Sequence, residues 1–207
     1  MPLPDEDQLV SAATTAAIGT AKTTGTFLKM RKIKTASART KPTILKTSHP
    51  FMLDDKNVTW YPSYGAEMRG GTVNCSVVMS DTEVSAVQKV KAESITVLNQ
   101  ASFDKFVSCV KKGGSIIVNS SLAAIKKTRE DINYIFVPLT KLAQEKLGNI
   151  RMANILALGV LSRVSKLVSI ETLEKALYNV IPARRANLIP KNIEALKLGY
   201  EYDLLKV

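Results

Sequence analysis

The stretch "SITVLNQASFDKFVSCVKKGGSIIVN", residues 94–119, decides the fold, because it contains a strand, a helix and a second strand in succession. "SITVLN" and "SIIVN" are short apolar runs rich in β-branched residues, which is typical of buried parallel strands. Gly113 and Gly114 are placed to end the helix between them in a left-handed cap. The apolar residues of that helix recur at helical spacing: Phe103, Phe106, Val107 and Val110.

The alternation continues on both sides of this unit. "NVTWYP" (57–62) and the alternating "TVNCSVVMS" (72–80) predict two earlier strands, and "INYIFVP" (132–138) predicts a later one. "TKLAQEKLG" (140–148) predicts a helix that ends at Gly148. Strands that alternate with helices predict an α/β three-layer sandwich with a largely parallel, Rossmann-like sheet.

The end of the chain is predicted to be helical. "IRMANILALGVLSRVS" (150–165) is apolar nearly all round, so we expect a buried helix whose Gly159 allows another backbone to approach. Ser169 is placed to cap a further helix, with Glu171 in its first turn. A last helix is expected after Pro190.

Residues 1–48 differ in composition from the rest of the chain. Residues 11–48 contain thirteen Ser or Thr and eight Lys or Arg, with no Asp or Glu. This composition is typical of weak order, and only "MRKIK" (30–34) indicates the start of a strand. We therefore divide the chain into a basic N-terminal segment, 1–48, and one domain, 49–207.

The net charge of +11 raises the question of nucleic acid, but the basic segment contains Phe27 as its one aromatic residue. It therefore offers no base-stacking platform, and we expect no specific nucleic-acid binding. No apolar run of about 18 residues is present, and the N-terminus lacks the pattern of a secretory signal, so we expect a cytoplasmic protein without a membrane span.

Metal and thiol chemistry have few candidate residues. The sequence has two cysteines, Cys75 and Cys109, and one histidine, His49. Iron–sulfur clusters and structural zinc sites normally take four such ligands, so we expect no metal site within this chain. Buried apolar cysteines are the favoured interpretation, and a cysteine nucleophile would lack a convincing histidine partner.

The stretch "WYPSYGAEMRGGTVNC" (60–75) concentrates aromatic residues, glycines and charge at the entry to a strand. Arg69 offers a planar fork for a carboxylate or phosphate, and the adjacent glycines let backbone N–H groups face a ligand. The alternative is a tight turn with Arg69 and Glu67 solvated or paired locally. Asn99–Gln100 and Asn119–Ser120 follow two other strands, where they line the same sheet edge or cap the next helix.

Four stretches in register resemble the gamma subunit of 2-oxoacid:ferredoxin oxidoreductases. They are "WYPSYGAEMRGGTVNCSVVMSD" (60–81), "VLNQASFDKF" (97–106), "VKKGGSIIVNSSL" (110–122) and "VPLTKLAQEKLGNIRMANILALG" (137–159). The resemblance runs from about Met52 to Tyr202 and is nearest to the 2-oxoglutarate branch. It favours a ligand- or partner-binding loop, with the candidate residues Tyr61, Tyr64, Gly65, Glu67, Met68, Arg69, Gly70, Gly71 and Asn74. Asn99, Gln100 and Asn119, which follow other strands, are further candidates for the same binding role, and helix capping stays open for them.

The resemblance implies a complex that oxidatively decarboxylates a 2-oxoacid to an acyl-coenzyme A and passes electrons to ferredoxin. Thiamine diphosphate, Mg²⁺ and iron–sulfur clusters are then expected in alpha, beta and delta-type partner subunits. This chain is expected to be structural, to hold no catalytic residue and to help shape the coenzyme A side, and dimer formation stays open.

One feature departs from the family. Members of the family have a Gly-rich turn after the first strand, whereas no residue of this chain from Thr35 to Lys56 is glycine. We therefore treat the segment before about Met52 as anomalous: either a diverged replacement or a shifted reading of the gene. A stand-alone coenzyme A or nucleotide-binding module and a basic nucleic-acid-binding protein remain the alternatives.

Overall fold

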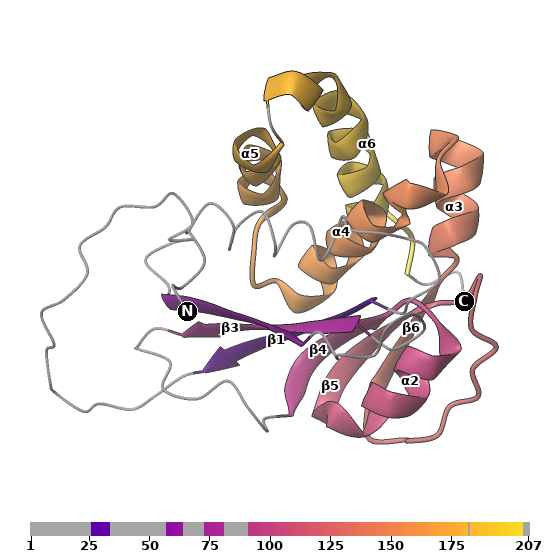
Figure 1. Cartoon of the computed structure of the whole chain (residues 1–207). Helices are drawn as coiled ribbons and strands as arrows, with labels where there is room; N and C mark the ends of the chain where they lie inside the picture. Colours follow the sequence, from indigo (N-terminus) through magenta and orange to yellow (C-terminus); the bar gives the residue numbers. More distant parts are fainter. Residues whose placement is uncertain (1–25, 34–56, 64–72, 81–90, 182, 205–207) are drawn as a thin grey trace, which may run out of the picture.

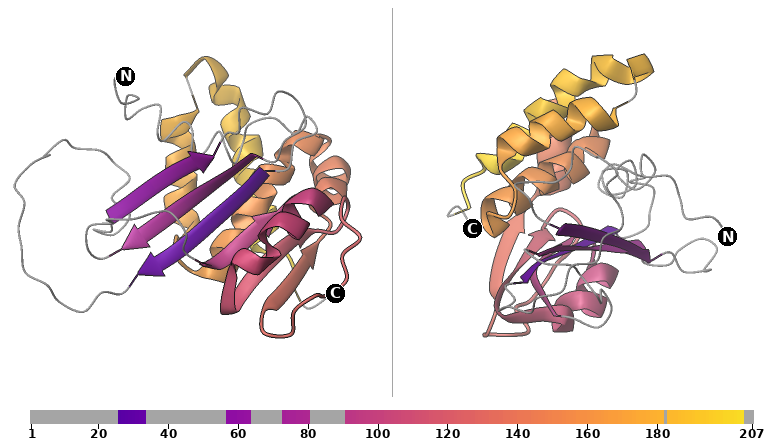
Figure 2. Two further views of the ribbon diagram at one scale, coloured as in Figure 1. Left: turned by 60° about the horizontal axis from the view of Figure 1, so that its bottom comes forward. Right: turned by 90° about the vertical axis from the view of Figure 1, so that its left-hand side faces the viewer.

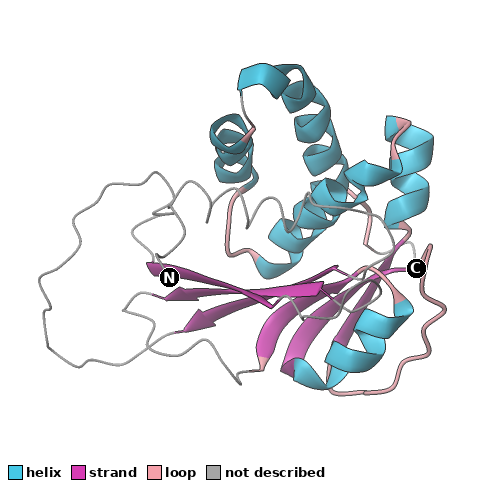
Figure 3. Cartoon of the chain, in the orientation of Figure 1, coloured by secondary structure: helices cyan, strands magenta, loops and turns pink. Residues whose placement is uncertain are grey.

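The computed structural model describes residues 26–33, 57–63, 73–80, 91–181 and 183–204. These residues form a sheet with helices on both faces (Figures 1 and 3). The strands are β1 (Thr26–Ile33), β2 (Asn57–Ser63), β3 (Val73–Ser80), β4 (Ala92–Val97), β5 (Val110–Asn119) and β6 (Asn133–Val137). The helices are α2 (Gln100–Phe106), α3 (Leu139–Leu147), α4 (Ala153–Ser165), α5 (Ile170–Val180) and α6 (Ile189–Tyr200), with short 3₁₀ turns η2 (Val107–Cys109), η3 (Ile150–Met152) and η4 (Ala183–Leu188).

The sheet order among the described strands is β2-β3-β1-β4-β5-β6. Strands β4, β5 and β6 are parallel neighbours, and β1 is parallel to β3. The pairs β1–β4 and β2–β3 are antiparallel, so the sheet is mixed with parallel pairing in the majority. The predicted α/β sandwich is confirmed.

Two hydrophobic cores lie on opposite faces of the sheet. Because strand side chains alternate, Ile116 and Val118 of β5 pack on the α2 side, whereas Ile117 packs under helices α3 to α6. All three side chains are fully buried. The helical layer on one face and α2 on the other are visible in Figure 2. This alternation is the physical reason for the apolar run that predicted a buried strand.

Strand β1 lies between β3 and β4, within the segment 1–48 that composition set apart. It begins at Thr26, four residues before the "MRKIK" that indicated a strand. The division of the chain at residue 48 stays a prediction.

The prediction for the helix after β4 was wrong at its C-terminal end. Helix α2 ends at Phe106, and Val110 already pairs with Ala92 of β4. Gly113 does have a positive φ of 76°, but it lies inside β5, where the register against β4 shifts. The hydrogen-bond partners offered by β4 outweigh the local helical spacing of the apolar residues.

Helices α4 and α6 cross at unusually close backbone distance. A Cβ atom built on Gly159 would lie 2.1 Å from the carbonyl oxygen of Leu196, and one built on Gly199 would lie 2.0 Å from that of Leu156. No side chain fits at either position without moving a helix. The expected role of Gly159 in close packing is therefore confirmed.

Helix α5 begins as predicted at Ser169, whose Oγ accepts a hydrogen bond of 3.2 Å from the backbone N–H of Thr172. Hydrogen bonds from the backbone amide of Glu171 and from Ser169 lower the pKa of the Glu171 carboxyl. Replacing Ser169 with alanine removes the cap and should lower the free energy of unfolding by about 1 kcal/mol. Urea denaturation measures this, and Ser169→Asp, which keeps a capping oxygen, should remain near the wild type.

Candidate functional site

The register between neighbouring strands places several candidate residues along one edge of the sheet. Asn74 of β3 is level with Phe27 of β1, and Phe27 is level with Val97 at the end of β4. Val97 is level with Val118 of β5, immediately before Asn119. This edge therefore contains the carboxyl ends of β2, β4, β5 and β6 and the starts of β1 and β3. With strands about 4.8 Å apart, β3 and β4 are separated by about 10 Å.

The structure places the beginning and the end of the predicted loop at this edge of the sheet. Tyr61 lies in β2, level with Ser76, and Ser63 is level with Asn74, so the chain leaves β2 and enters β3 at this edge. The remaining loop candidates lie outside the described residues: Tyr64, Gly65, Glu67, Met68, Arg69, Gly70 and Gly71. Their role stays a prediction.

Asn119 makes four hydrogen bonds at this edge through its side-chain amide. It is 1% exposed, and its Nδ2 donates to the carbonyl oxygen of Leu98 at 3.3 Å and to Thr140 Oγ1 at 2.9 Å. Its Oδ1 accepts hydrogen bonds from the backbone N–H groups of Ser121 and Thr140, each at 3.3 Å. One amide group thus joins the end of β4, the turn after β5 and the first turn of α3.

The N-terminus of α3 is capped from a distance. Pro138 occupies the N-cap position and provides no side-chain cap. The free N–H groups of the first turn are instead bonded by Asn119 Oδ1 and by Ser121 Oγ, which accepts from Lys141 at 3.1 Å. Because these donors are already engaged, this helix end has less capacity to bind an anion.

Asn99 and Gln100 make local contacts. The Oδ1 of Asn99 accepts a 2.9 Å hydrogen bond from the N–H of Ser102 and so caps α2, as the alternative interpretation predicted. Gln100 Nε2 donates to Asp104 Oδ1 at 2.9 Å on the surface of the same helix. Contact with a ligand or partner stays a prediction for both residues.

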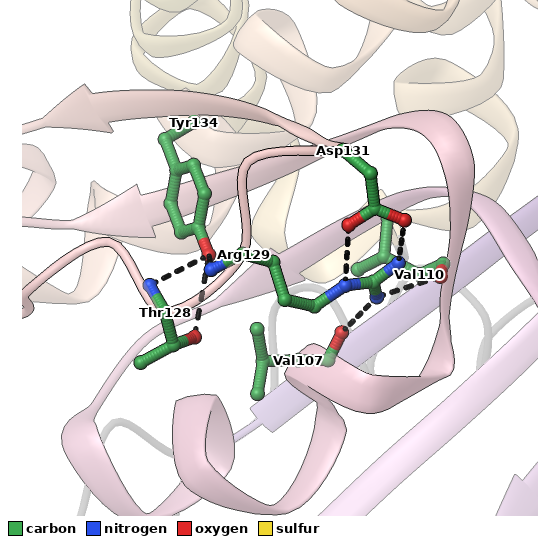
Figure 4. Close-up of polar contacts among 6 residues, drawn as sticks. All are labelled: Val107, Val110, Thr128, Arg129, Asp131 and Tyr134. Atoms are coloured by element: carbon green, nitrogen blue, oxygen red, sulfur yellow. Dashed lines mark hydrogen bonds and ion pairs between the residues drawn. The ribbon is translucent and has the colours of Figure 1, made fainter.

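A second polar cluster, which the sequence did not predict, surrounds Arg129 beside η2 and the start of β5 (Figure 4). The guanidinium donates to both carboxylate oxygens of Asp131, at 2.8 and 2.6 Å. Its Nη1 also donates to the carbonyl oxygens of Val107 and Val110, each at 2.9 Å. These carbonyls lie 19 to 22 residues away in the chain, so no local pattern reveals the contact.

Tyr134 completes the same cluster. Its hydroxyl oxygen accepts hydrogen bonds from the backbone N–H groups of Thr128 at 3.2 Å and Arg129 at 3.1 Å (Figure 4). The cluster ties the connection between β5 and β6 to both strands. We assign it to the stability of the α2 face, because all the charges are satisfied within the chain.

The hydrogen bonds from Arg129 lower the pKa of Asp131, with the positive charges of Arg129 and Lys112 acting in the same direction. A carboxylate with a depressed pKa stabilises the fold above its unfolded-state pKa of about 4, and the contribution is lost as pH falls through the folded-state pKa. Acidification should therefore reduce the difference in unfolding free energy between the wild type and Asp131→Asn. Denaturation at several pH values tests this, and the NMR-measured pKa of Asp131 should rise in Arg129→Lys. An unchanged Asp131 pKa would contradict the pairing.

Metal-ligand groups are limited. Within the described ranges, no three His, Cys, Asp or Glu side chains come together in a way that could hold a metal ion. Cys109 is a half-buried free thiol against the α2 core. Cys75 lies in β3, and His49 lies outside the described residues. The described residues thus do not fit an iron–sulfur cluster. Among them, no helix has the length and apolar character needed to cross a membrane.

Comparison with known proteins gives the family. A family described as pyruvate ferredoxin/flavodoxin oxidoreductase matches residues 44–202. The chain belongs to this family. The 2-oxoglutarate synthase subunit KorC of Methanocaldococcus jannaschii is 33% identical over 151 residues, which cover 72% of this chain and 79% of that protein. The ketoisovalerate oxidoreductase subunit VorA of Methanothermobacter marburgensis is 35% identical over 108 residues, covering 52% of this chain but 22% of that longer protein.

Solved structures agree with this family. The gamma subunit of a keto/oxoacid ferredoxin oxidoreductase from Geobacter sulfurreducens is 28% identical, with a TM-score of 0.62 over 73% of this chain and 82% of that chain. A 2-oxoglutarate:ferredoxin oxidoreductase from Magnetococcus marinus, 20% identical with a TM-score of 0.56, shares the fold over 69% of this chain and 25% of that chain. The resemblance to the gamma subunit is confirmed, and the chain is a subunit-type member of an oxidoreductase family.

Proposed function

We propose that this chain is the gamma subunit of a complex that oxidatively decarboxylates 2-oxoglutarate, releases CO₂, transfers the acyl group to coenzyme A and passes the electrons to ferredoxin. The observation that carries the proposal is the similarity to KorC of M. jannaschii, a 2-oxoglutarate synthase subunit, over 79% of its length. KorC subunits of three further organisms are 26–28% identical to this chain. Relatives named for pyruvate and ketoisovalerate are the reason that the substrate requires a direct test.

The role proposed for this chain is structural. Thiamine diphosphate, Mg²⁺ and the iron–sulfur clusters would be held by alpha, beta and delta-type partner subunits in the cytoplasm. Two cysteines and one histidine in the whole chain support this division, since a cluster normally takes four ligands. The loop after β2, including Tyr64 and Arg69, would contact a partner or bound coenzyme A at the sheet edge described above.

The test is co-production of this chain with its alpha, beta and delta-type partners, followed by measurement of coenzyme A-dependent ferredoxin reduction. We expect kcat/KM for 2-oxoglutarate to exceed that for pyruvate and 2-oxoisovalerate by at least about tenfold. The chain purified alone should have no activity. A complex that prefers pyruvate would refute the substrate assignment, and activity of the isolated chain would refute the structural role.

A stand-alone coenzyme A-binding module is the competing function. Calorimetry on the isolated chain distinguishes the two. Binding of coenzyme A to the chain alone, with no association with the partner subunits, would favour the module. The engaged donors at the start of α3 argue against such a site at that position.

A further inference from the structure

The corner where α5 passes through η4 into α6 combines positive charge with exposed apolar side chains. Residues 175–193 contain no Asp or Glu. Tyr178 is 61% exposed and Leu188 is 40% exposed, although both are large apolar side chains. We call this surface the basic corner, and it comprises Lys175, Tyr178, Arg184, Arg185, Leu188 and Lys191.

The connection that runs from α5 through η4 into α6 lies at the end of the helical layer that is farthest from the sheet (Figures 1 and 2). Residues 183–188 of η4 are all exposed. In the described part of the chain, no ion pair engages Arg184, Arg185 or Lys191. The charges of these three residues are thus available to a partner.

The corner is held in shape from beneath. Leu177 and Ile181 of the same segment pack into the core, and Glu174 of α5 forms a 3.2 Å ion pair with Lys197 of α6. Asn192 is buried, and its Nδ2 donates a 2.7 Å hydrogen bond to the carbonyl oxygen of Leu188. The exposed side chains are therefore presented on fixed backbone, which reduces the entropy lost on binding.

The composition matches a protein interface more than an ordinary surface. Tyrosine and arginine are enriched at the residues that dominate binding energy, and an apolar centre with a charged rim is the usual arrangement. Lys175 interacts electrostatically with Glu171 on α5, whereas Arg184, Arg185 and Lys191 lie in a stretch without Asp or Glu, and their charge favours a partner with negative charge. A second copy would bring Arg184 and Arg185 opposite like charges, and for nucleic acid the corner offers Tyr178 as its one aromatic ring.

We propose that the basic corner docks a partner subunit of the complex whose contact surface has carboxylates around an apolar patch. This inference rests on the proposed function, in that it requires the chain to be a subunit. The sheet edge and the basic corner would then be two separate contact regions of the chain.

The first experiment measures affinity between the full chain and the preassembled partner subunits at low and high salt. The double variant Arg184→Glu/Arg185→Glu should weaken binding at least about tenfold, mainly at low salt. The double variant Tyr178→Ala/Leu188→Ala should weaken binding at both salt concentrations. Lys126→Glu/Lys127→Glu is the matched control: it makes the same charge change at exposed residues of the β5–β6 connection and should bind like the wild type.

The second experiment identifies the occupant by carbodiimide cross-linking, which joins a lysine amine directly to a carboxylate. We expect Lys175 and Lys191 to cross-link to Asp or Glu of a partner subunit. Cross-links between two copies of this chain, or protection of these lysines by RNA instead, would overturn the proposal.

The outcomes separate this inference from the proposed function. If the wild type assembles and is active while both corner variants bind equally well, the docking surface is refuted and the function stands. If the wild type does not associate with the partner subunits, both are refuted. Circular dichroism and thermal melting of each variant establish that a loss of binding is not a loss of folding.

Discussion

Replacing Gly159 with alanine is expected to lower the free energy of unfolding by about 3 kcal/mol. The new Cβ would lie 2.1 Å from the carbonyl oxygen of Leu196 and 2.8 Å from the backbone nitrogen of Tyr200. These are backbone atoms of α6, so no side-chain rotation relieves the contact and the two helices must separate. In a helix without this neighbour, replacing glycine with alanine would raise the free energy of unfolding by about 1 kcal/mol. A lowered free energy of unfolding in Gly159→Ala would therefore show that α6 packs directly against this position.

Thermal unfolding measures the loss, which corresponds to about 6 to 12 °C in Tm for a chain of this size. Gly148→Ala is the matched control, because Gly148 has a φ of +66° and nothing within 4 Å of its added Cβ. It should cost about 1 kcal/mol through backbone strain alone. A Tm for Gly159→Ala equal to or above that of the wild type would disprove the close crossing of α4 and α6.

Replacing Asn119 with alanine should also lower the unfolding free energy by about 3 kcal/mol, since buried hydrogen-bonding groups would lose their partners. The substitution removes two donated and two accepted hydrogen bonds at the edge of the sheet. Two of these involve Thr140, so the loss includes part of the cap of α3. Chemical denaturation gives the free energy, and Ser120→Ala at the exposed neighbouring position is the control.

A double-mutant cycle isolates the contact with Thr140. Thr140→Val keeps the shape of the side chain and removes Oγ1, the acceptor for Asn119 Nδ2. Residues in one hydrogen-bond network usually couple, so the two substitutions together should cost about 1 kcal/mol less than the sum of the single changes. Strict additivity would show that the hydrogen bond between Asn119 Nδ2 and Thr140 Oγ1 contributes nothing to the coupling.

The sequence predicted the elements whose signals are local. Gly148 ends α3 in a left-handed conformation and Ser169 caps α5, because each contact spans only a few residues. Asn99 caps α2, which was one of the two interpretations left open for it. The same local logic failed at Gly113–Gly114. There the N–H of Gly113 donates to the carbonyl oxygen of Asp131 at 2.8 Å, and a Cβ on Gly114 would lie 2.8 Å from the carbonyl oxygen of Glu93. Both neighbours are distant in sequence.

In the candidate site, too, the sequence predicted a local feature but not the contacts between distant residues. The pattern of the sequence indicated that Asn119 lies where a strand ends, but its bonds to Leu98 and Thr140 span 21 residues and were not predictable. The Arg129 cluster was missed for the same reason. No local pattern distinguishes an arginine that binds distant carbonyls from one that is solvated.

The amino-acid sequence by itself determined the α/β class, most of the strands and helices, and the family. Periodicity, caps and motifs each depend on residues that lie close together in the sequence. The tertiary structure alone decided the mixed strand order, the backbone contact between α4 and α6, and the partners of Asn119 and Arg129. These depend on which segments meet in space, and the free energy of such meetings comes from burial and from hydrogen bonds between residues far apart in the chain.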